Sequence, residues 1–219
     1  KVMNTPRASS QSVAELAMGL MFACSRYISI AGHTMREDKW EKNAYGKGIE
    51  LAGKTLGVVG YGRIGQATAN IARALGMEVI AFNRSPKEDV ETVSLEELLR
   101  RSDIVSVHCP LNAESRDLFN KTTFARMKQG ALFVNTARGG VIEEDALCDA
   151  LNSGRLAGAG IDVLDTEPMR PGHPYLTAKN CYITPHVAWG TLDARSRLIT
   201  MVAENLKAYE AGKPINKVN

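Results

Sequence analysis

The chain has 219 residues, enough for one well-filled domain or for one domain with part of another. Its 44% hydrophobic and 23% charged residues are ordinary for a globular protein, and a formal net charge of +3 is small. Lysine and arginine are scattered rather than massed, so we predict no nucleic-acid partner and no membrane partner.

The sequence predicts neither a membrane span nor a signal peptide, and its cysteines indicate a reducing compartment. The longest apolar run, from Leu16 to Cys24, is too short to span a bilayer, and no apolar segment typical of a signal peptide follows Lys1. Because the first residue is not Met, we expect a fragment or a processed product. The cysteines lie far apart without a CxxC pair, which predicts free thiols in a reducing compartment such as the cytoplasm, and no metal site. They are Cys24, Cys109, Cys148 and Cys181.

The N-terminal region contains a long apolar segment. Its composition predicts one helix over Ser12–Ile30, with apolar residues on much of its surface. A helix of this kind must be covered on several sides, so we expect it to pack against a partner chain or a second domain.

From Lys54 onward, short apolar runs alternate with helical stretches. The predicted strands are Thr55–Val59, Glu78–Phe82, Ile104–Val107, Ala131–Val134, Ala159–Leu164 and Cys181–Thr184. The predicted helices are Ile64–Leu75, Leu95–Arg101, Thr122–Met127, Glu143–Leu151 and a long one from Thr191 to about Ala211. Parallel neighbours need crossover connections, so this rhythm predicts an α/β fold with a doubly wound parallel sheet, as in Rossmann-type NAD(P)-binding domains.

A glycine motif joins the first strand of this series to its helix. The run Gly60-Tyr61-Gly62-Arg63-Ile64-Gly65 follows a strand and opens a helix, which is the context that makes a GxGxxG signal specific. In that context Gly60 permits a tight turn, Gly62 lets a pyrophosphate approach the backbone, and Gly65 lets the helix pack on the strand. The helix N-terminus then offers free N–H groups to the anion.

The residues that follow the second strand indicate whether the chain prefers NAD or NADP(H). An NAD-binding site usually carries Asp or Glu there, whereas this chain has Asn83-Arg84-Ser85. No carboxylate repels a 2′-phosphate, and Arg84 offers a guanidinium to pair with one, which favours NADP(H) or tolerance of it. The alternative is that Arg84 stacks on adenine or points to water.

Three residues with suitable chemistry follow predicted strands. Arg138 lies in the run from Asn135 to Gly140, Glu167 precedes Pro168, and His186 follows Pro185. Ligands of open α/β sheets bind outside the carboxyl ends of the strands, so these side chains are expected to converge. A guanidinium binds the carboxylate of a 2-keto acid, a histidine supplies a proton to the keto oxygen, and a neighbouring carboxylate stabilises the imidazolium. Taken singly, each has a structural alternative: a surface ion pair, a loop residue or a structural histidine.

The motifs together resemble the D-isomer-specific 2-hydroxyacid dehydrogenase family over nearly the whole chain. They are Gly60–Gly65, Val107–Leu111, Asn135–Gly140, Asp162–Pro168 and Pro185-His186. The resemblance implies that Arg138 binds substrate, that His186 is the acid/base and that Glu167 is its partner.

The resemblance also implies a set of cofactor contacts. Arg63 and Ile64 would meet the phosphates, Asn83 the ribose, and Asp162 the carboxamide of the nicotinamide. Together with the glycine motif and Asn83-Arg84-Ser85, the expected cofactor-binding residues include Cys109, Pro110, Thr136, Ala137, Arg138, Asp162, His186, Ala188 and Trp189.

Two branches of the family share this chain's features. Met3–Pro6, Ser12–Leu16 and Asp38–Glu41 look most like D-3-phosphoglycerate dehydrogenases, which use NAD, and this is the substrate class we expect first. His186–Gly190 and Gly212–Asn216 resemble glycerate dehydrogenases and glyoxylate/hydroxypyruvate reductases, which remain the alternative.

The family further implies a domain arrangement. Residues 1–190 would form the dinucleotide-binding domain, including an interdomain helix at 12–30 that builds a homodimer. Residues 191–219 would return to a substrate domain that is otherwise absent, so this fragment would bind cofactor and turn over poorly or not at all. Since fold does not fix function, two other classes stay open: a non-catalytic dinucleotide-sensing corepressor and a structural or dimerisation fragment.

Overall fold

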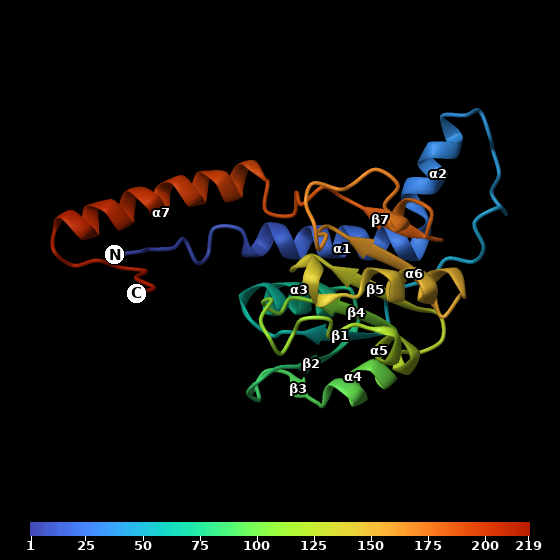
Figure 1. The fold of residues 1–219 in the computed structure, drawn as a ribbon, viewed down its shortest axis with the longest axis horizontal. Coiled ribbons are helices and arrows are strands. Elements are labelled where there is room, and N and C mark those ends of the chain that lie inside the picture. The colour runs from blue at the N-terminus through green and yellow to red at the C-terminus, as the bar shows by residue number, and fades with distance from the viewer.

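The computed structural model describes residues 1–219 and contains one seven-stranded sheet (Figure 1). The strands are β1 (Thr55–Val59), β2 (Glu78–Phe82), β3 (Glu91–Thr92), β4 (Ile104–Val107), β5 (Ala131–Asn135), β6 (Leu156–Ile161) and β7 (Cys181–Ile183). The helices are α1 (Ser10–Arg26), α2 (Ile28–Met35), α3 (Arg63–Ala74), α4 (Leu95–Arg101), α5 (Lys121–Arg126), α6 (Glu144–Asn152) and α7 (Leu192–Glu210), with short 3-10 turns at Gly139–Val141 and Pro174–Leu176.

All neighbouring strands are parallel, in the order β3-β2-β1-β4-β5-β6-β7. The direction of the strand order reverses between β1 and β4. This confirms the predicted doubly wound α/β fold, and it places a topological switch point at the carboxyl end of β1, where such sheets bind ligands.

The two faces of the sheet are covered by different helices. Leu132 and Val134 of β5 share a core cluster with residues of α1 and α3. Phe133, between them, belongs to the cluster formed with α4, α5 and α6. Successive side chains of a strand point to opposite faces, so one buried strand supplies both cores.

The apolar segment near the N-terminus is not one helix, as predicted, but two. α1 ends at Arg26, Tyr27 adopts a left-handed conformation with φ of 56°, and α2 continues at an angle of 65°. A single residue of changed backbone conformation redirects the chain while the helical sequence pattern runs on. Neither helix alone is long and apolar enough to cross a membrane, and only the bent pair passes that test by length and composition.

The expected partner for this segment is not needed to cover α1. Ala17, Met21 and Cys24 of α1 are buried against the chain's own sheet and α3. Gly160 of β6 lets α1 approach closely, because a Cβ there would lie 2.6 Å from Cβ of Leu20. The apolar surface of α1 is therefore explained within this domain, whereas Ile28, Ile30 and Met35 of α2 are exposed.

Other differences from the predicted elements are small. β6 spans Leu156–Ile161 rather than 159–164, because its hydrogen bonding with β5 begins at Leu156 and the chain turns away after Ile161. The two-residue edge strand β3 was not predicted. All four cysteines are free, as predicted.

Helix α7 lies apart from the sheet (Figure 1). Its apolar residues, including Ile199, Val202 and Leu206, are exposed. The N-terminal residues run beside α7 and the segment after it: Asn205 of α7 donates to the carbonyl of Asn4 at 3.0 Å, and Met3 forms an isolated bridge with Lys217.

Phe133 is expected to be a main contributor to stability. Its ring is buried and makes edge contacts with Phe119 and Phe124, at centroid distances of 4.8 and 5.3 Å. Phe133→Ala should lower the free energy of unfolding by about 3–5 kcal/mol, since it leaves a cavity in the core. Chemical denaturation measures this change. Leu192→Ala is the control, because Leu192 is 84% exposed and its loss should change stability by less than about 0.5 kcal/mol.

Candidate active site

The glycine motif forms a tight turn between β1 and α3. Gly60 has φ of 95°, and a Cβ on it would lie 2.6 Å from the backbone nitrogen of Cys109. A Cβ on Gly65 would lie 2.3 Å from the carbonyl oxygen of Gly60, whereas nothing lies within 4 Å of a Cβ on Gly62. The first and third glycines are thus required for packing, and the second leaves open space at the helix N-terminus, where a phosphate group fits.

Asn83 and Arg84 flank this turn differently. Asn83 accepts a hydrogen bond from the backbone of Tyr61 at 3.1 Å and donates to the carbonyl of Ser85 at 2.9 Å. Arg84 is 80% exposed, and its guanidinium lies 3.2 Å from the Glu114 carboxylate, which is equally exposed. Asn83 therefore secures the glycine turn. Arg84 lies in an exposed ion pair with Glu114 beyond the carboxyl end of β2, so the structure places a carboxylate there that the sequence did not predict.

A cavity of about 790 Å³ lies beyond the carboxyl ends of the central strands. It is lined by Ser9, Val13, Ile64, His108, Cys109, Pro110, Leu111, Thr136, Ala137, Arg138, His186, Ala188 and Trp189. Nine of the expected cofactor residues are among them, whereas Gly60, Gly62, Arg63 and Gly65 of the glycine motif, the run Asn83-Arg84-Ser85, and Asp162 are not. The side chain of Arg63 donates to the carbonyl of Pro6 at 3.2 Å, and Asp162 is buried behind the cavity wall.

Sequence reasoning missed four of the lining residues. His108 and Leu111 belong to a motif that was quoted for the family resemblance without a role for either of them. Ser9 directly precedes α1, and Val13 lies near its start within the Ser12–Leu16 motif of the family resemblance, again without a role assigned to it.

Two buried polar atoms at this cavity lack partners. They are Nδ1 of His108 and Oγ1 of Thr136. Burial lowers the pKa of His108 to about 4, so its ring is neutral, and Nε2 lies 2.9 Å from the Ser106 hydroxyl. Buried polar groups are normally satisfied, so these two atoms fit a polar ligand such as the nicotinamide half of a dinucleotide.

Arg138 is held by a buried side chain at the end of β5. Asn135 accepts a hydrogen bond from the backbone of Ala137 and donates to the carbonyl of Arg138, both at 2.9 Å. The next residue, Gly139, is pressed against the chain after β6, where a Cβ would lie 1.8 Å from the carbonyl carbon of Leu164. The Arg138 turn is therefore fixed to the segment that leads to Glu167.

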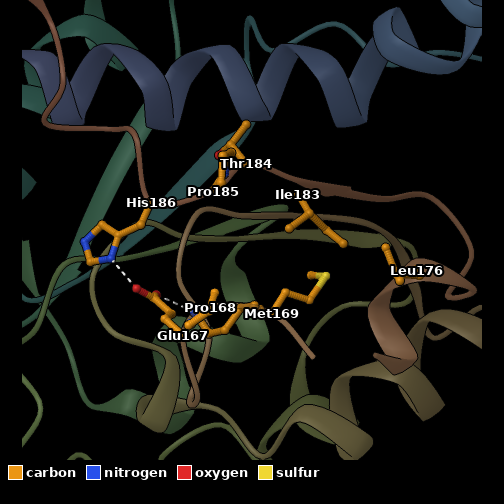
Figure 2. A pocket seen from close by; sticks show the side chains of 9 residues that line it. Glu167, Pro168, Met169, Leu176, Ile183, Thr184, Pro185 and His186 are labelled. Atoms are coloured by element: carbon orange, nitrogen blue, oxygen red, sulfur yellow. Dashed lines mark hydrogen bonds and ion pairs between the residues drawn. The ribbon is translucent and has the colours of Figure 1, made fainter. Parts of the chain in front are cut away.

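His186 and Glu167 form a hydrogen-bonded pair (Figure 2). Nδ1 of His186 lies 2.7 Å from Oε2 of Glu167, and the two side chains are 41% and 37% exposed. Oε1 of Glu167 accepts from the backbone of Leu164 at 3.0 Å. Partial burial tends to raise the pKa of Glu167, but the hydrogen bonds from His186 and Leu164 and the charges of His186 and Arg138 outweigh it, so the pKa is lowered.

His186 lines two cavities. Arg138 and His186 line the first, while Glu167 and His186 line a second, of about 600 Å³, together with apolar residues such as Met169, Leu176 and Ile183 (Figure 2). His186 thus shares one cavity with Arg138 and one with Glu167, while the guanidinium of Arg138 donates to the carbonyl of Ala137 at 2.6 Å.

The chain is similar to proteins of a known family over most of its length. Residues 18–188 match the model of the D-isomer specific 2-hydroxyacid dehydrogenase, NAD binding domain. A hydroxypyruvate reductase from Blautia hydrogenotrophica is 42% identical over all of this chain and 71% of its own length. A D-3-phosphoglycerate dehydrogenase from Methanocaldococcus jannaschii is also 42% identical, over 97% of this chain and 41% of its own.

A solved structure shows the same fold with a cofactor. An acyclic imino acid reductase, Bsp5, in complex with NADPH and D-arginine, has a TM-score of 0.92 and 35% identity. The match covers 100% of this chain and 71% of that one.

The exposed position of Arg84 allows a test of cofactor choice. Arg84→Ala should weaken binding of NADPH roughly tenfold while changing NADH binding less than twofold, because one hydrogen-bonded charge pair with the 2′-phosphate is lost. Titration of both cofactors by fluorescence measures this. Arg100→Ala, which removes an exposed arginine on α4 far from the site, is the control. An equal decrease in affinity for NADPH and NADH, or no decrease for either, would contradict a role for Arg84 in binding the 2′-phosphate.

Proposed function

Because this chain belongs to the D-isomer specific 2-hydroxyacid dehydrogenase family, we propose that it interconverts a small 2-keto acid and its D-2-hydroxy acid, with hydroxypyruvate as the keto acid. The observation that carries the proposal is the 2.7 Å contact between His186 and Glu167 beside the cavity that Arg138 also lines. The position of that cavity beyond the carboxyl ends of the central strands, where open α/β sheets bind ligands, supports it as the cofactor site.

Each side chain has a distinct part in the proposed reaction. Arg138 binds the substrate carboxylate and draws the keto group toward His186. Nδ1 of His186 is engaged by Glu167, so Nε2 is left to give a proton to the keto oxygen. Glu167 stabilises the imidazolium and fixes the ring. The bound dinucleotide supplies the hydride to the carbonyl carbon.

The cofactor would be held by the groups described above. The N-terminus of α3, with Gly62 and the backbone of Arg63 and Ile64, would bind the phosphates. Asn83 and Ser85 would lie at the ribose, with Arg84 at its 2′ position. Residues lining the first cavity, Cys109, Pro110, Thr136, Ala137, Ala188 and Trp189 among them, would surround the nicotinamide.

D-3-Phosphoglycerate dehydrogenase activity is the second candidate. It is favoured by the N-terminal motifs and by the 42% identical Methanocaldococcus jannaschii relative. Reduction of hydroxypyruvate, glyoxylate and 3-phosphohydroxypyruvate with NADH and with NADPH separates the candidates. Tight cofactor binding without turnover of any of the three would support a non-catalytic dinucleotide sensor instead.

We also propose the larger arrangement that the family suggests. Residues 1–190 form the dinucleotide-binding domain, and α7 returns to a substrate domain, in keeping with the exposed apolar residues on α7. The exposed side chains of Ile28, Ile30 and Met35 suit a homodimer in which α2, rather than α1, makes most of the contact.

His186→Ala should lower kcat for hydroxypyruvate reduction by roughly 10²–10⁴-fold, because no general acid remains. Binding of NADPH should change less than twofold, since the cofactor is held mainly by other groups. Steady-state kinetics and cofactor titration measure the two quantities. A parallel loss of cofactor binding would identify His186 as a structural residue. His33→Ala, at an exposed histidine of α2, is the matched control.

Glu167→Gln should move the acid limb of hydroxy-acid oxidation to lower pH. Oxidation needs the neutral imidazole, and loss of the adjacent carboxylate removes the interaction that favours the imidazolium. The pH dependence of kcat/KM measures the shift. An unmoved acid limb would count against the pairing of Glu167 with His186 in the reaction.

A further inference from the structure

The backbone of His186 is in an uncommon conformation. Its φ is 52°, in the left-handed region that residues other than glycine rarely adopt. Such a conformation persists only where the surrounding structure holds it, and it often occurs at functional sites. Contacts from the surrounding structure must therefore stabilise the left-handed turn at His186, the proposed proton donor.

Asp162 supplies that support. It directly follows β6, and its side chain belongs to a residue only 1% exposed. Oδ1 accepts hydrogen bonds from the Thr184 hydroxyl at 2.5 Å and from the backbone of Val187 at 3.0 Å. Oδ2 accepts from the backbone of Ala188 at 2.9 Å.

The main chain of Asp162 holds the same turn. Its carbonyl accepts from the backbone N–H of His186 at 2.8 Å, and its own N–H donates to the carbonyl of Asn135 at 3.0 Å. Asp162 thus connects the carboxyl ends of β5 and β6 to the backbone on both sides of His186. Losing the carboxylate would leave the N–H groups of Val187 and Ala188 without their partner.

We infer that Asp162, through Thr184 and the backbone of Val187 and Ala188, is the positioning residue that fixes His186 in its left-handed conformation opposite Glu167. Its effect on rate rests on the proposed function, but its effect on the turn does not. The carboxylate serves the turn directly, whatever contact Asp162 also makes with a bound cofactor.

Thr184 offers the cleanest test of this role. Its hydroxyl contacts Asp162, but the residue lines the second cavity and not the one that His108 and Thr136 share. Thr184→Val keeps the shape of the side chain and removes the hydroxyl. Thr184→Ser keeps the hydroxyl and is the matched rescue variant.

Two measurements on both variants decide the matter. Hydrogen exchange of the Val187 and Ala188 amides, followed by NMR, should be about tenfold faster in Thr184→Val and near wild type in Thr184→Ser. With a keto acid that the wild type turns over, kcat should fall about tenfold in Thr184→Val, with NADPH affinity unchanged within twofold and activity restored in Thr184→Ser.

Two results would overturn the inference. One is a wild-type exchange rate of the Val187 and Ala188 amides in Thr184→Val. The other is an equal decrease in kcat in Thr184→Val and Thr184→Ser. If the wild type reduces none of the three keto acids, the proposed function fails, while the exchange rates still decide whether Asp162 and Thr184 hold the turn. Asp162→Asn should raise the exchange rates and lower kcat more than Thr184→Val does. The amide NH2 would replace one carboxylate oxygen and place a donor against a backbone N–H group.

Discussion

The parallel pairing of β1 with β2 and β4 is the constraint on which the site depends. Parallel strands end at the same edge of a sheet, and the reversal of strand order next to β1 leaves room there that no crossover helix fills. The glycine turn, the Arg138 turn and the His186 turn all leave strands at this edge. Residues that are about 50 to 120 positions apart in the sequence meet because of that arrangement, and no local interaction would bring them together.

Short polar side chains at the strand ends convert this approximate convergence into a defined geometry. Asn83 bonds to the glycine turn, Asn135 closes the turn of Arg138, and Asp162 closes the turn of His186. Each accepts a hydrogen bond from a backbone N–H group that the strand pairing leaves free. The side chains proposed to act on substrate, such as His186 and Glu167, are more exposed than Asn135 and Asp162, as expected for a site on loops held by a rigid sheet.

The residues that indicate the family are different from those that would select one substrate. The glycine turn and the set Arg138, Glu167 and His186 lie within this chain, and in the proposed reaction that set acts on features that all 2-keto acids share, a carboxylate and a carbonyl oxygen. Groups that distinguish one substrate tail from another must contact the tail itself. The second cavity, which Glu167 and His186 line, contains no lysine or arginine, so it offers no cationic side chain to a phosphate tail.

Sequence alone determined the alternation of strands and helices and the glycine turn, and it supplied the proposed set Arg138, Glu167 and His186. These features follow from local periodicity, from glycine at fixed spacing and from residue chemistry, all of which are written within a few neighbouring positions. The break at Tyr27, the burial of α1 on its own sheet and the start of β6 at Leu156 were decided by packing between distant segments. The same is true of Ser9, Val13 and His108 in the cavity, and of the hold of Asp162 on the His186 turn. Their contacts link residues that the chain separates by tens of positions, and only the folded sheet specifies which of many possible partners each one meets.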